Sequence, residues 1–393
     1  MERDLEKNSL LNLLKSNMVI NITLLACSFV VAFLIAELTL RIVSPHKQFS
    51  SLYLNVNEQS VFPGYALYPG LNEQFTYTSN HLGYRSNHLF GKDSYGILAI
   101  GGSTTECVYL GDENGWTQLL ETRLNSTSNQ AITVGNVGSA GLAAPNHYLQ
   151  LKHLVPQYKY VDMVVVLVGV NDFLKALQLN GVQDEMTLEE NYRRTFKDYP
   201  RAVNKKWYRK TELWMHMRDV NNGWKNLFGH LTPDSLISIS NSTMEMRRKA
   251  IKTDALPDLL IYLDGYEEYI RDMVSLSNQY KTKLVLITQP VLWHENMSDF
   301  EEQLTIFGIP PTIDGYTYST KALAEGMELY NDRLRMVADE MNVTIIDLAE
   351  VLPKDTSIFY DYCHFNLEGA ERVADTVYDH LKLLISEPIV HDN

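Results

Sequence analysis

Residues 97–102 read ILAIGG and run directly into Ser103-Thr104-Thr105-Glu106. An apolar run rich in isoleucine that ends in two glycines is typical of a buried strand followed by a sharp turn. A serine after such a turn would stand at the N-terminus of the next helix, where backbone N–H groups and the helix dipole favour developing negative charge. Taken alone, the serine could equally be a simple helix N-cap.

Further apolar runs follow, and amphipathic segments separate them. The runs are AITVGNVG (131–138), DMVVVLVG (162–169), KLVLITQPV (283–291) and VTIIDLAEVL (343–352). The amphipathic segments are 115–125, 145–156, 260–280, 321–341 and 367–385. Strands that alternate with helices in this way predict a parallel sheet covered on both faces, with ligands bound at the carboxyl ends of the strands.

Two of these strand ends carry residues that could bind an oxyanion. Gly141 follows the second strand, where its backbone N–H could come close to a bound substrate, although a turn glycine is the commoner meaning. Asn171 follows the third strand, where its amide could donate a hydrogen bond to an oxyanion or close an Asx turn. Each signal is weak by itself.

The sequence Asp361-Tyr362-Cys363-His364 precedes the last predicted helix. His364 could accept the Ser103 proton through one ring nitrogen, while Asp361 holds the other nitrogen. A solvated surface loop would also explain this pair taken alone. One shared catalytic pocket explains all four placements together, so we expect Ser103, Asp361 and His364 to be catalytic.

These motifs resemble the four blocks of the SGNH, or GDSL-like, hydrolases, with Ser103, Gly141, Asn171 and His364 in the four named positions. The resemblance covers about 97–385 and implies a flavodoxin-like three-layer α/β/α sandwich with a mainly five-stranded parallel sheet. It also implies acyl-ester chemistry without a metal or an organic cofactor. By resemblance, the oxyanion hole combines the N–H groups of Ser103 and Gly141 with the Asn171 side chain.

The first block departs from its eponymous form, because Gly102 stands where the family name has aspartate. This GGST variant is similar to that of glycan-directed and membrane-anchored bacterial relatives. The segment His81-Leu82-Gly83-Tyr84-Arg85 also resembles the lead-in of membrane-anchored members.

Composition narrows the classes of partner and cofactor. The 393 residues carry a formal net charge of -14, which argues against a nucleic-acid partner because phosphate binding needs a basic face. No cysteine or histidine cluster has zinc-ligand spacing, so we expect no metal. An oxidising compartment would permit a bridge between Cys107 and Cys363, but two free thiols are the simpler interpretation.

The N-terminus predicts a membrane anchor. Met18 to Ala36 reads MVINITLLACSFVVAFLIA, an uncharged stretch long enough to cross a hydrocarbon core of about 30 Å as a helix. We expect a single-pass protein with its catalytic domain on the extracytoplasmic side, although the positive-inside bias is slight. The predicted organisation is a tail (1–17), a transmembrane anchor (18–40), a juxtamembrane segment packed on the domain (41–95) and a hydrolase domain (96–393).

Residues 174–256 interrupt the alternation and read as an insertion. Within it, the segment 193–225 holds ten lysines or arginines, with Trp207, Tyr208, Trp214 and Trp224 interleaved. A helical cap with a solvated basic face would explain this pattern. A surface that contacts anionic lipid headgroups or sugar rings would explain it as well.

We therefore expect a membrane-anchored serine esterase that cleaves an acyl ester, with acetyl favoured, from a glycan. The first alternative is an O-acyltransferase that modifies an exported polysaccharide; the Asp-His pair follows the serine here, which favours hydrolysis. The second is a lipase or thioesterase at the membrane surface. A non-enzymatic scaffold is disfavoured by the complete set of catalytic residues. Sequence leaves open the acyl group, the protein partners and the oligomeric state.

Overall fold

The protein is described by a computed structural model that covers residues 2–43, 59–63, 70–71, 74–80, 82–86, 88–182, 186–196, 206–218, 245–246, 249–305, 308 and 315–385. The chain divides into two compact units. Residues 1–48 and 200–230 form the first unit, and residues 49–199 and 231–393 form the second.

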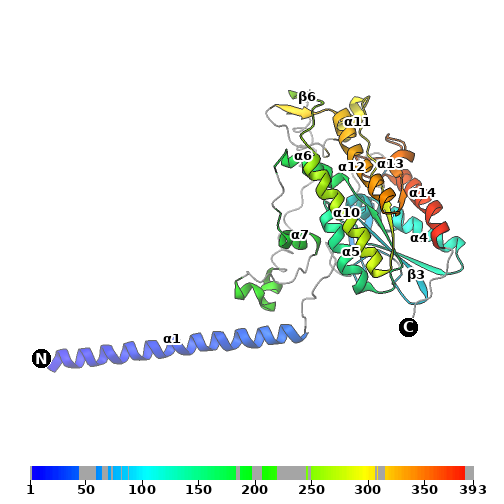
Figure 1. Cartoon of the computed structure of the whole chain (residues 1–393). Helices are drawn as coiled ribbons and strands as arrows, with labels where there is room; N and C mark the ends of the chain where they lie inside the picture. Colours follow the sequence, from blue (N-terminus) through cyan, green and yellow to red (C-terminus); the bar gives the residue numbers. More distant parts are fainter. Residues whose placement is uncertain are drawn as a thin grey trace. The chain divides into compact units, whose positions relative to one another are not determined.

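The second unit is built on a five-stranded parallel sheet with strand order β4-β3-β5-β7-β9. Figure 1 labels β3 of this sheet and the helices around it. The strands are β3 (Ser94–Gly101), β4 (Ala131–Asn136), β5 (Met163–Leu167), β7 (Lys283–Ile287) and β9 (Thr344–Ile346). This order is that of a flavodoxin-like, doubly wound sheet, in which ligands gather outside the carboxyl ends of the strands. The predicted fold class is confirmed.

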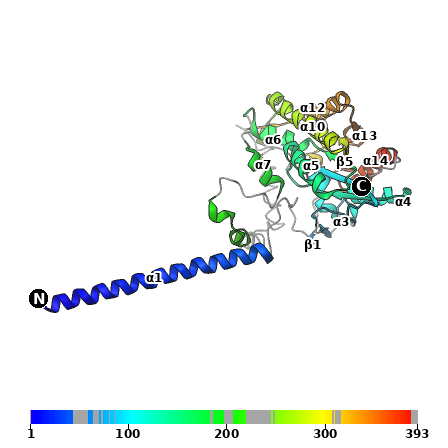
Figure 2. The ribbon, with the colours of Figure 1, turned by 60° about the horizontal axis from the view of Figure 1, so that its bottom comes forward.

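Helices cover both faces of this sheet, with α5, α10 and α12 on one side and α4 and α14 on the other (Figure 2). Their bounds are α4 (Trp116–Thr127), α5 (Ala144–Tyr158), α10 (Leu260–Tyr280), α12 (Thr320–Glu340) and α14 (Leu367–Ile385). Each helix lies within about three residues of the amphipathic segment that predicted it.

The core has two halves because successive strand side chains point to opposite faces. In β5, Val164 and Val166 pack under α5, α10 and α12, whereas Met163, Val165 and Leu167 pack under α4 and α14. All five side chains are at most 1% exposed. Full burial of one such aliphatic side chain stabilises the fold by about 1.5–3 kcal/mol, so β5 is a main contributor to stability.

One predicted strand is too long. The apolar run 343–352 forms a strand only over Thr344–Ile346, and Leu348–Val351 form the short helix α13. The side chain of Asp347 accepts a hydrogen bond from the Glu350 N–H and so caps that helix. The apolar residues after Asp347 are buried by packing rather than by pairing, which periodicity alone does not distinguish.

The remaining elements of the second unit are short. They are β1 (Gln59–Pro63), β2 (Gln74–Thr78), α2 (Ser103–Glu106), η1 (Val108–Leu110), α3 (Gly111–Asn114), α6 (Val170–Leu179), α7 (Leu188–Thr195), β6 (Ile251–Thr253), α11 (Asp299–Leu304) and β8 (Tyr316–Tyr318). β1 and β2 pair antiparallel, and β6 pairs with β8 in parallel. The predicted juxtamembrane segment thus contributes a hairpin, and the backbone N–H of Thr78 donates to Asp112 of α3.

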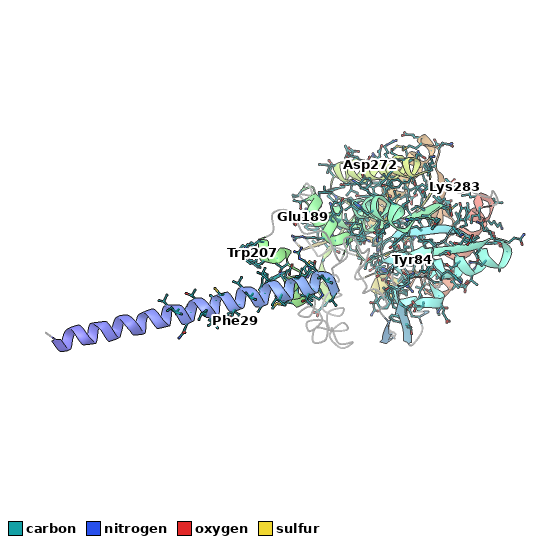
Figure 3. All side chains as sticks on the ribbon, turned by 90° about the horizontal axis from the view of Figure 1, so that it is seen from below. Phe29, Tyr84, Glu189, Trp207, Asp272 and Lys283 are labelled. Atoms are coloured by element: carbon teal, nitrogen blue, oxygen red, sulfur yellow. The ribbon has the colours of Figure 1, made fainter. Side chains whose placement is uncertain are left out.

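The first unit contains α1 (Glu2–Val43), η2 (Trp207–Lys210) and a helical stretch at 212–218 (Figure 3). Within α1, Met18–Val43 has a mean hydropathy of 2.6, and the length and composition suffice to cross a membrane. The segment from the predicted insertion therefore belongs to the same unit as the predicted anchor.

Candidate active site

The predicted site residues come from four separate connections at the carboxyl edge of the sheet. Ser103 begins α2 directly after β3, and Gly141 lies between β4 and α5. Asn171 lies in the first turn of α6 after β5, and His364 precedes α14. Because the strands are parallel, these connections emerge at one edge, and the structure brings their residues together.

Ser103 and His364 are in direct contact although 261 positions separate them in the sequence. The Ser103 Oγ lies 2.7 Å from His364 Nε2. The other ring nitrogen, Nδ1, faces a carboxylate and therefore carries the proton, which leaves Nε2 as an acceptor for the serine hydroxyl. This is the arrangement that a general base needs.

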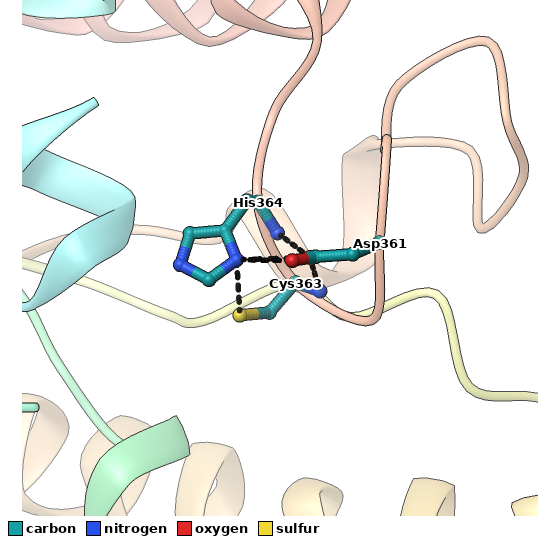
Figure 4. A group of neighbouring side chains, drawn as sticks. All are labelled: Asp361, Cys363 and His364. Carbon is teal, nitrogen blue, oxygen red and sulfur yellow. Dashed lines mark hydrogen bonds and ion pairs between the residues drawn. The ribbon is translucent and has the colours of Figure 1, made fainter. Parts of the chain in front are cut away.

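Asp361 fixes the orientation of His364 through its side chain and the backbone (Figure 4). His364 Nδ1 lies 2.7 Å from Asp361 Oδ2. The other carboxylate oxygen, Oδ1, accepts the backbone N–H groups of Cys363 at 3.0 Å and of His364 at 2.8 Å. These hydrogen bonds hold residues 361–364 around the Asp361 carboxylate, so the His364 ring and the carboxylate keep their relative orientation.

Aromatic rings pack around the histidine. The Tyr360 ring stacks on the His364 imidazole with centroids 5.5 Å apart and an interplanar angle of 12°. The Tyr362 ring meets the imidazole edge-on and stacks on the buried Trp293. These contacts restrict rotation of the imidazole, because a tilt of the ring would collide with a neighbour.

The charge environment sets the protonation of the histidine. Burial alone would lower the pKa of His364, but the adjacent Asp361 carboxylate outweighs burial and holds that pKa well above its usual range. The charged imidazolium form of His364 is therefore stabilised. Burial raises the pKa of the Cys363 thiol, so this neighbour is protonated at neutral pH.

Gly141 takes a left-handed backbone conformation with φ +74°, which a side chain would strain. A hydrogen bond fixes the residue before it, because the Ala140 N–H donates to Glu106 Oε2 at 2.8 Å. Glu106 is only 5% exposed, and its burial raises its pKa to about 7 against the opposing effects of Ala140 and Arg85. A buried acid on α2 thus positions the connection that contains Gly141.

Asn171 lies directly against the first block. Its Nδ2 donates one hydrogen bond to the Leu142 carbonyl at 2.8 Å, and a primary amide has a second N–H available. A Cβ added at Gly102 would stand 2.6 Å from this nitrogen. A side chain at position 102 would therefore displace the Asn171 amide from its observed position.

A small hollow opens beside Ser103. It encloses about 170 Å³ of empty space, including the part open to solvent. Its lining is Ser103, Thr104, Cys107, Tyr109, Leu110, Tyr360, His364 and Phe365. The hollow is small, so it suits a small group.

One set of side chains in the described ranges has the spacing of metal ligands. The ligand atoms of Asp361, Cys363 and His364 lie within 4.8 Å of one another. However, His364 Nδ1 already faces Asp361, and Cys363 is a protonated thiol at neutral pH. Cys107 and Cys363 are both free and buried.

Sequence reasoning missed the residues that support this site. Glu106, Arg85 and Arg194 were not among the predicted residues. Arg85 is 3% exposed and donates to the carbonyl oxygens of Glu106 and Gly111, which fixes the segment that follows Ser103. Arg194 of α7 places a guanidinium nitrogen 3.7 Å from where a Gly141 Cβ would lie. The glutamate could have been suspected from its position in the first helical turn. Arg85 lies in the segment 81–85 and Arg194 in the basic segment 193–225, but neither pattern indicates which groups these side chains contact.

Comparisons with known proteins agree with this architecture. The model of a family described as the GDSL-like Lipase/Acylhydrolase family matches residues 99–372, more than two thirds of the chain. A search of curated proteins found no match.

Solved structures match at low sequence identity. A catalytic mutant of Axe2, an acetylxylan esterase from Geobacillus stearothermophilus, is 14% identical with a TM-score of 0.42, covering 75% of this chain and 96% of that chain. TesA is 13% identical with a TM-score of 0.40, covering 74% and 99%. A lipolytic protein of the G-D-S-L family from Desulfitobacterium hafniense is 14% identical with a TM-score of 0.38, covering 73% and 99%.

Proposed function

The chain belongs to the GDSL-like lipase/acylhydrolase family and is an ester-bond hydrolase, and from this premise we propose that Ser103, His364 and Asp361 form its catalytic triad. One observation carries the proposal: the 2.7 Å contact between Ser103 Oγ and His364 Nε2, with Asp361 on the opposite ring nitrogen. Nucleophile, base and orienting carboxylate follow one another in hydrogen-bond contact, which is the geometry that acyl transfer requires.

In the first step, the Ser103 oxygen attacks the ester carbonyl carbon while its proton moves to His364 Nε2. The carbonyl π electrons move to the oxygen and form a tetrahedral oxyanion. We assign its donors to the backbone N–H groups of Ser103 and Gly141 and to the second N–H of the Asn171 amide. Ser103 begins α2, so its N–H has no partner within the helix and the helix dipole favours the anion.

Collapse of the tetrahedral intermediate breaks the ester C–O bond. The leaving alkoxide takes the proton from His364 Nε2 and departs as an alcohol, which leaves an acyl group on Ser103. Water then gives a proton to Nε2 and attacks the acyl carbon to form a second tetrahedral intermediate. Its collapse breaks the bond between the acyl carbon and Ser103 Oγ, releases the carboxylic acid, and returns the proton from Nε2 to Ser103. Asp361 stabilises the imidazolium in both steps without itself becoming protonated.

The substrate that we propose is a glycan bearing short acyl esters, with acetyl preferred. The hollow beside Ser103 is small, and the side chains of Tyr109 and Tyr360 form part of its lining. These two observations support a short acyl group. Arg194 lies at the Gly141 side of the site and supplies a polar contact for hydroxyl or carbonyl oxygens of a sugar. The first-block GGST variant supports the glycan class by resemblance alone.

We also propose that α1 anchors the protein in a membrane, with the hydrolase domain on the extracytoplasmic side. Met18–Val43 is apolar enough to span a bilayer, and none of the most apolar stretch is buried against protein. A helix of this composition would be costly to leave in water. Protease protection of the hydrolase domain in sealed vesicles of known orientation would decide the side.

A fluorophosphonate probe tests the nucleophile without knowledge of the substrate. We expect the full chain to be labelled stoichiometrically and Ser103→Ala to be unlabelled, with unchanged circular dichroism. Ser126→Ala, an exposed serine on α4, is the matched control and should label normally. Labelling of Ser103→Ala at the wild-type rate would show that another residue is the nucleophile.

The acyl group and the acceptor need a substrate panel. We expect hydrolysis of acetylated oligosaccharides to exceed that of lysophospholipids and long-chain thioesters. The reverse order would favour a lipase or thioesterase. Formation of a new acylated sugar at the expense of free acetate, measured with an added acceptor, would favour the O-acyltransferase.

A further inference from the structure

The segment 206–218 packs on the end of the apolar helix. The Trp207 ring meets the Phe33 ring edge-on, with centroids 6.1 Å apart and an interplanar angle of 87°. The Leu213 backbone N–H donates to Glu37 Oε2 at 3.1 Å. Figure 3 labels Trp207 next to α1 in the first unit. Residues that are about 175 positions apart in sequence therefore form one small structure.

Glu37 is the acidic group that joins the two parts. It is 8% exposed, whereas its neighbours Ile35 and Leu38 are 62% and 61% exposed. Besides the Leu213 N–H, its carboxylate accepts a hydrogen bond from Arg41 Nε at 2.8 Å. A paired carboxylate costs less than a bare one near hydrocarbon, so this position suits the boundary between lipid and water.

The length of α1 places the contact at that boundary. A helix rises about 1.5 Å per residue, so the stretch from Met18 to Glu37 is about 29 Å long, close to the ~30 Å hydrocarbon core. Phe33 lies one turn before Glu37, about 6 Å deeper. Trp207 against Phe33 would therefore lie at the depth where tryptophan and tyrosine gather in membrane proteins.

The exposed side chains of the segment fit a lipid interface. Trp207, Trp214 and Met217 are 71%, 39% and 60% exposed, which is a large apolar area for so short a stretch. Basic groups are interleaved with them: Lys206 is exposed, and the Arg209 guanidinium lies 5.8 Å from the centroid of the Trp214 ring. Aromatic rings with basic residues between them are typical of segments that lie in the headgroup region of anionic membranes.

We propose that residues 206–218 form an interfacial segment that lies in the headgroup region of a bilayer containing anionic lipid. Trp207 reaches the boundary of the acyl chains, and Lys206 and Arg209 contact headgroup phosphates. Glu37 ties the segment to α1 and so sets its depth. The proposal rests on the proposed membrane anchor, and it assigns the basic aromatic part of the insertion to lipid rather than to sugar rings.

Tryptophan fluorescence in vesicles tests this depth. The full chain is reconstituted in phosphatidylcholine vesicles with 20% phosphatidylglycerol, with and without lipids brominated near the headgroup end of the acyl chain. We expect brominated lipid to quench part of the emission, and Trp207→Phe to lose most of that quenchable part. Trp293→Phe is the matched control: it removes a fully buried ring of the second unit, so the quenchable emission should persist.

Flotation of the same vesicles separates the two proposals. If Trp207→Phe floats with the vesicles but is quenched as strongly as the wild type, the interfacial segment is wrong while the anchor stands. If the wild-type protein does not float, the anchor is wrong and the inference falls with it.

A second arm tests the charge. We expect the lipid-quenchable emission to be larger with phosphatidylglycerol than without it, and Arg209→Glu to remove that difference. Lys92→Glu, an exposed lysine of the second unit, should leave it unchanged. Equal quenching in anionic and zwitterionic vesicles would overturn the headgroup contact. Protection of Trp207 from aqueous iodide by soluble oligosaccharide, but not by vesicles, would assign the segment to sugar instead.

Discussion

Glu106 accepts a hydrogen bond from the backbone N–H of Ala140, the residue before Gly141. This contact joins the helix that begins at Ser103 to the loop that contains a proposed oxyanion donor. Ala140 is exposed, but Glu106 is buried and its carboxyl group is nearly inaccessible to water. Its protonation therefore affects the stability of the folded protein.

The first prediction concerns stability as a function of pH. Burial raises the Glu106 pKa from 4.5 to about 7, so the folded state binds this proton more tightly than the unfolded state. The contribution of Glu106 to the free energy of unfolding is then greatest below pH 4.5 and falls as the pH rises towards 7. The full difference corresponds to about 3 kcal/mol.

Glu106→Gln should remove this dependence. Urea denaturation at several pH values should show wild type and variant close together at pH 4.5, with the variant more stable above pH 7. Glu350→Gln is the control for the loss of one surface charge. A difference between wild type and Glu106→Gln that is constant from pH 4 to 8 would show that Glu106 does not titrate as described.

The second prediction concerns the general base. His364 must be neutral to accept the Ser103 proton, so kcat/KM should rise with pH through the His364 pKa. Asp361→Asn removes the charge that raises this pKa, so the midpoint should move to lower pH. The maximum should fall by about 10⁴, because an amide does not hold the required tautomer. A lower maximum with an unmoved midpoint would mean that Asp361 has no electrostatic effect on His364.

The third prediction concerns the contact between Gly102 and Asn171. An alanine at position 102 would displace the Asn171 amide by steric overlap, since Gly102 itself has an ordinary φ of -83°. We expect Gly102→Ala to lower kcat by about 10²–10³, the typical cost of losing one oxyanion donor. Asn171→Ala should cost about the same.

The double variant distinguishes this explanation from general disruption. If Gly102→Ala acts only by moving the amide, it should cost little more once Asn171 is alanine. Rates of the two single variants and of the double variant on p-nitrophenyl acetate give the coupling. Losses that simply multiply would mean that Gly102 acts independently of Asn171.

The fourth prediction concerns acyl-chain length. The Tyr109 ring contacts the Phe75 and Tyr360 rings edge-on and lines the hollow beside Ser103. Tyr109→Ala should enlarge the hollow and raise the ratio of kcat/KM for butyrate over acetate p-nitrophenyl esters. Butyrate is longer than acetate by two methylenes, and each contributes about 0.8 kcal/mol when fully buried, so the expected rise is up to about 15-fold.

The ratio does not depend on the amount of folded enzyme, which makes it robust to a loss of stability. Tyr316→Ala, an exposed tyrosine on β8, should leave it unchanged. An unchanged ratio for Tyr109→Ala would mean that the acyl group binds elsewhere.

Much of the fold could be predicted because its signals are local. Runs such as 162–169 are short, apolar on both faces and rich in valine, as expected for strands buried on both sides. The helices between them have clear amphipathic periodicity. The order of the strands in the sheet required the family resemblance, since pairing joins segments that are distant in sequence. The predicted end of the last strand was wrong. The apolar pattern continues to residue 352, but the strand ends at Ile346 and Asp347 caps the helix α13 that follows.

The site was predictable only in part for the same reason. Ser103 and His364 lie in motifs whose chemistry is readable from a few adjacent residues, and their 2.7 Å contact brings them together as expected. Their catalytic roles stay predictions. Arg85 and Glu106 are different, because the residues beside them do not indicate which distant groups they contact, such as the carbonyl oxygens that Arg85 binds. The Glu37–Leu213 contact joins segments so distant that only the fold reveals it.

The missing side chain at position 102 also has a consequence for how such a sequence can drift. A mutation to the aspartate of the eponymous motif would bring a Cβ atom at position 102 into the space that the Asn171 amide occupies. The Asn171 amide would have to move to admit that side chain, so positions 102 and 171 are sterically coupled. We expect a relative that has a side chain at the first position to hold the amide of its asparagine in a different place.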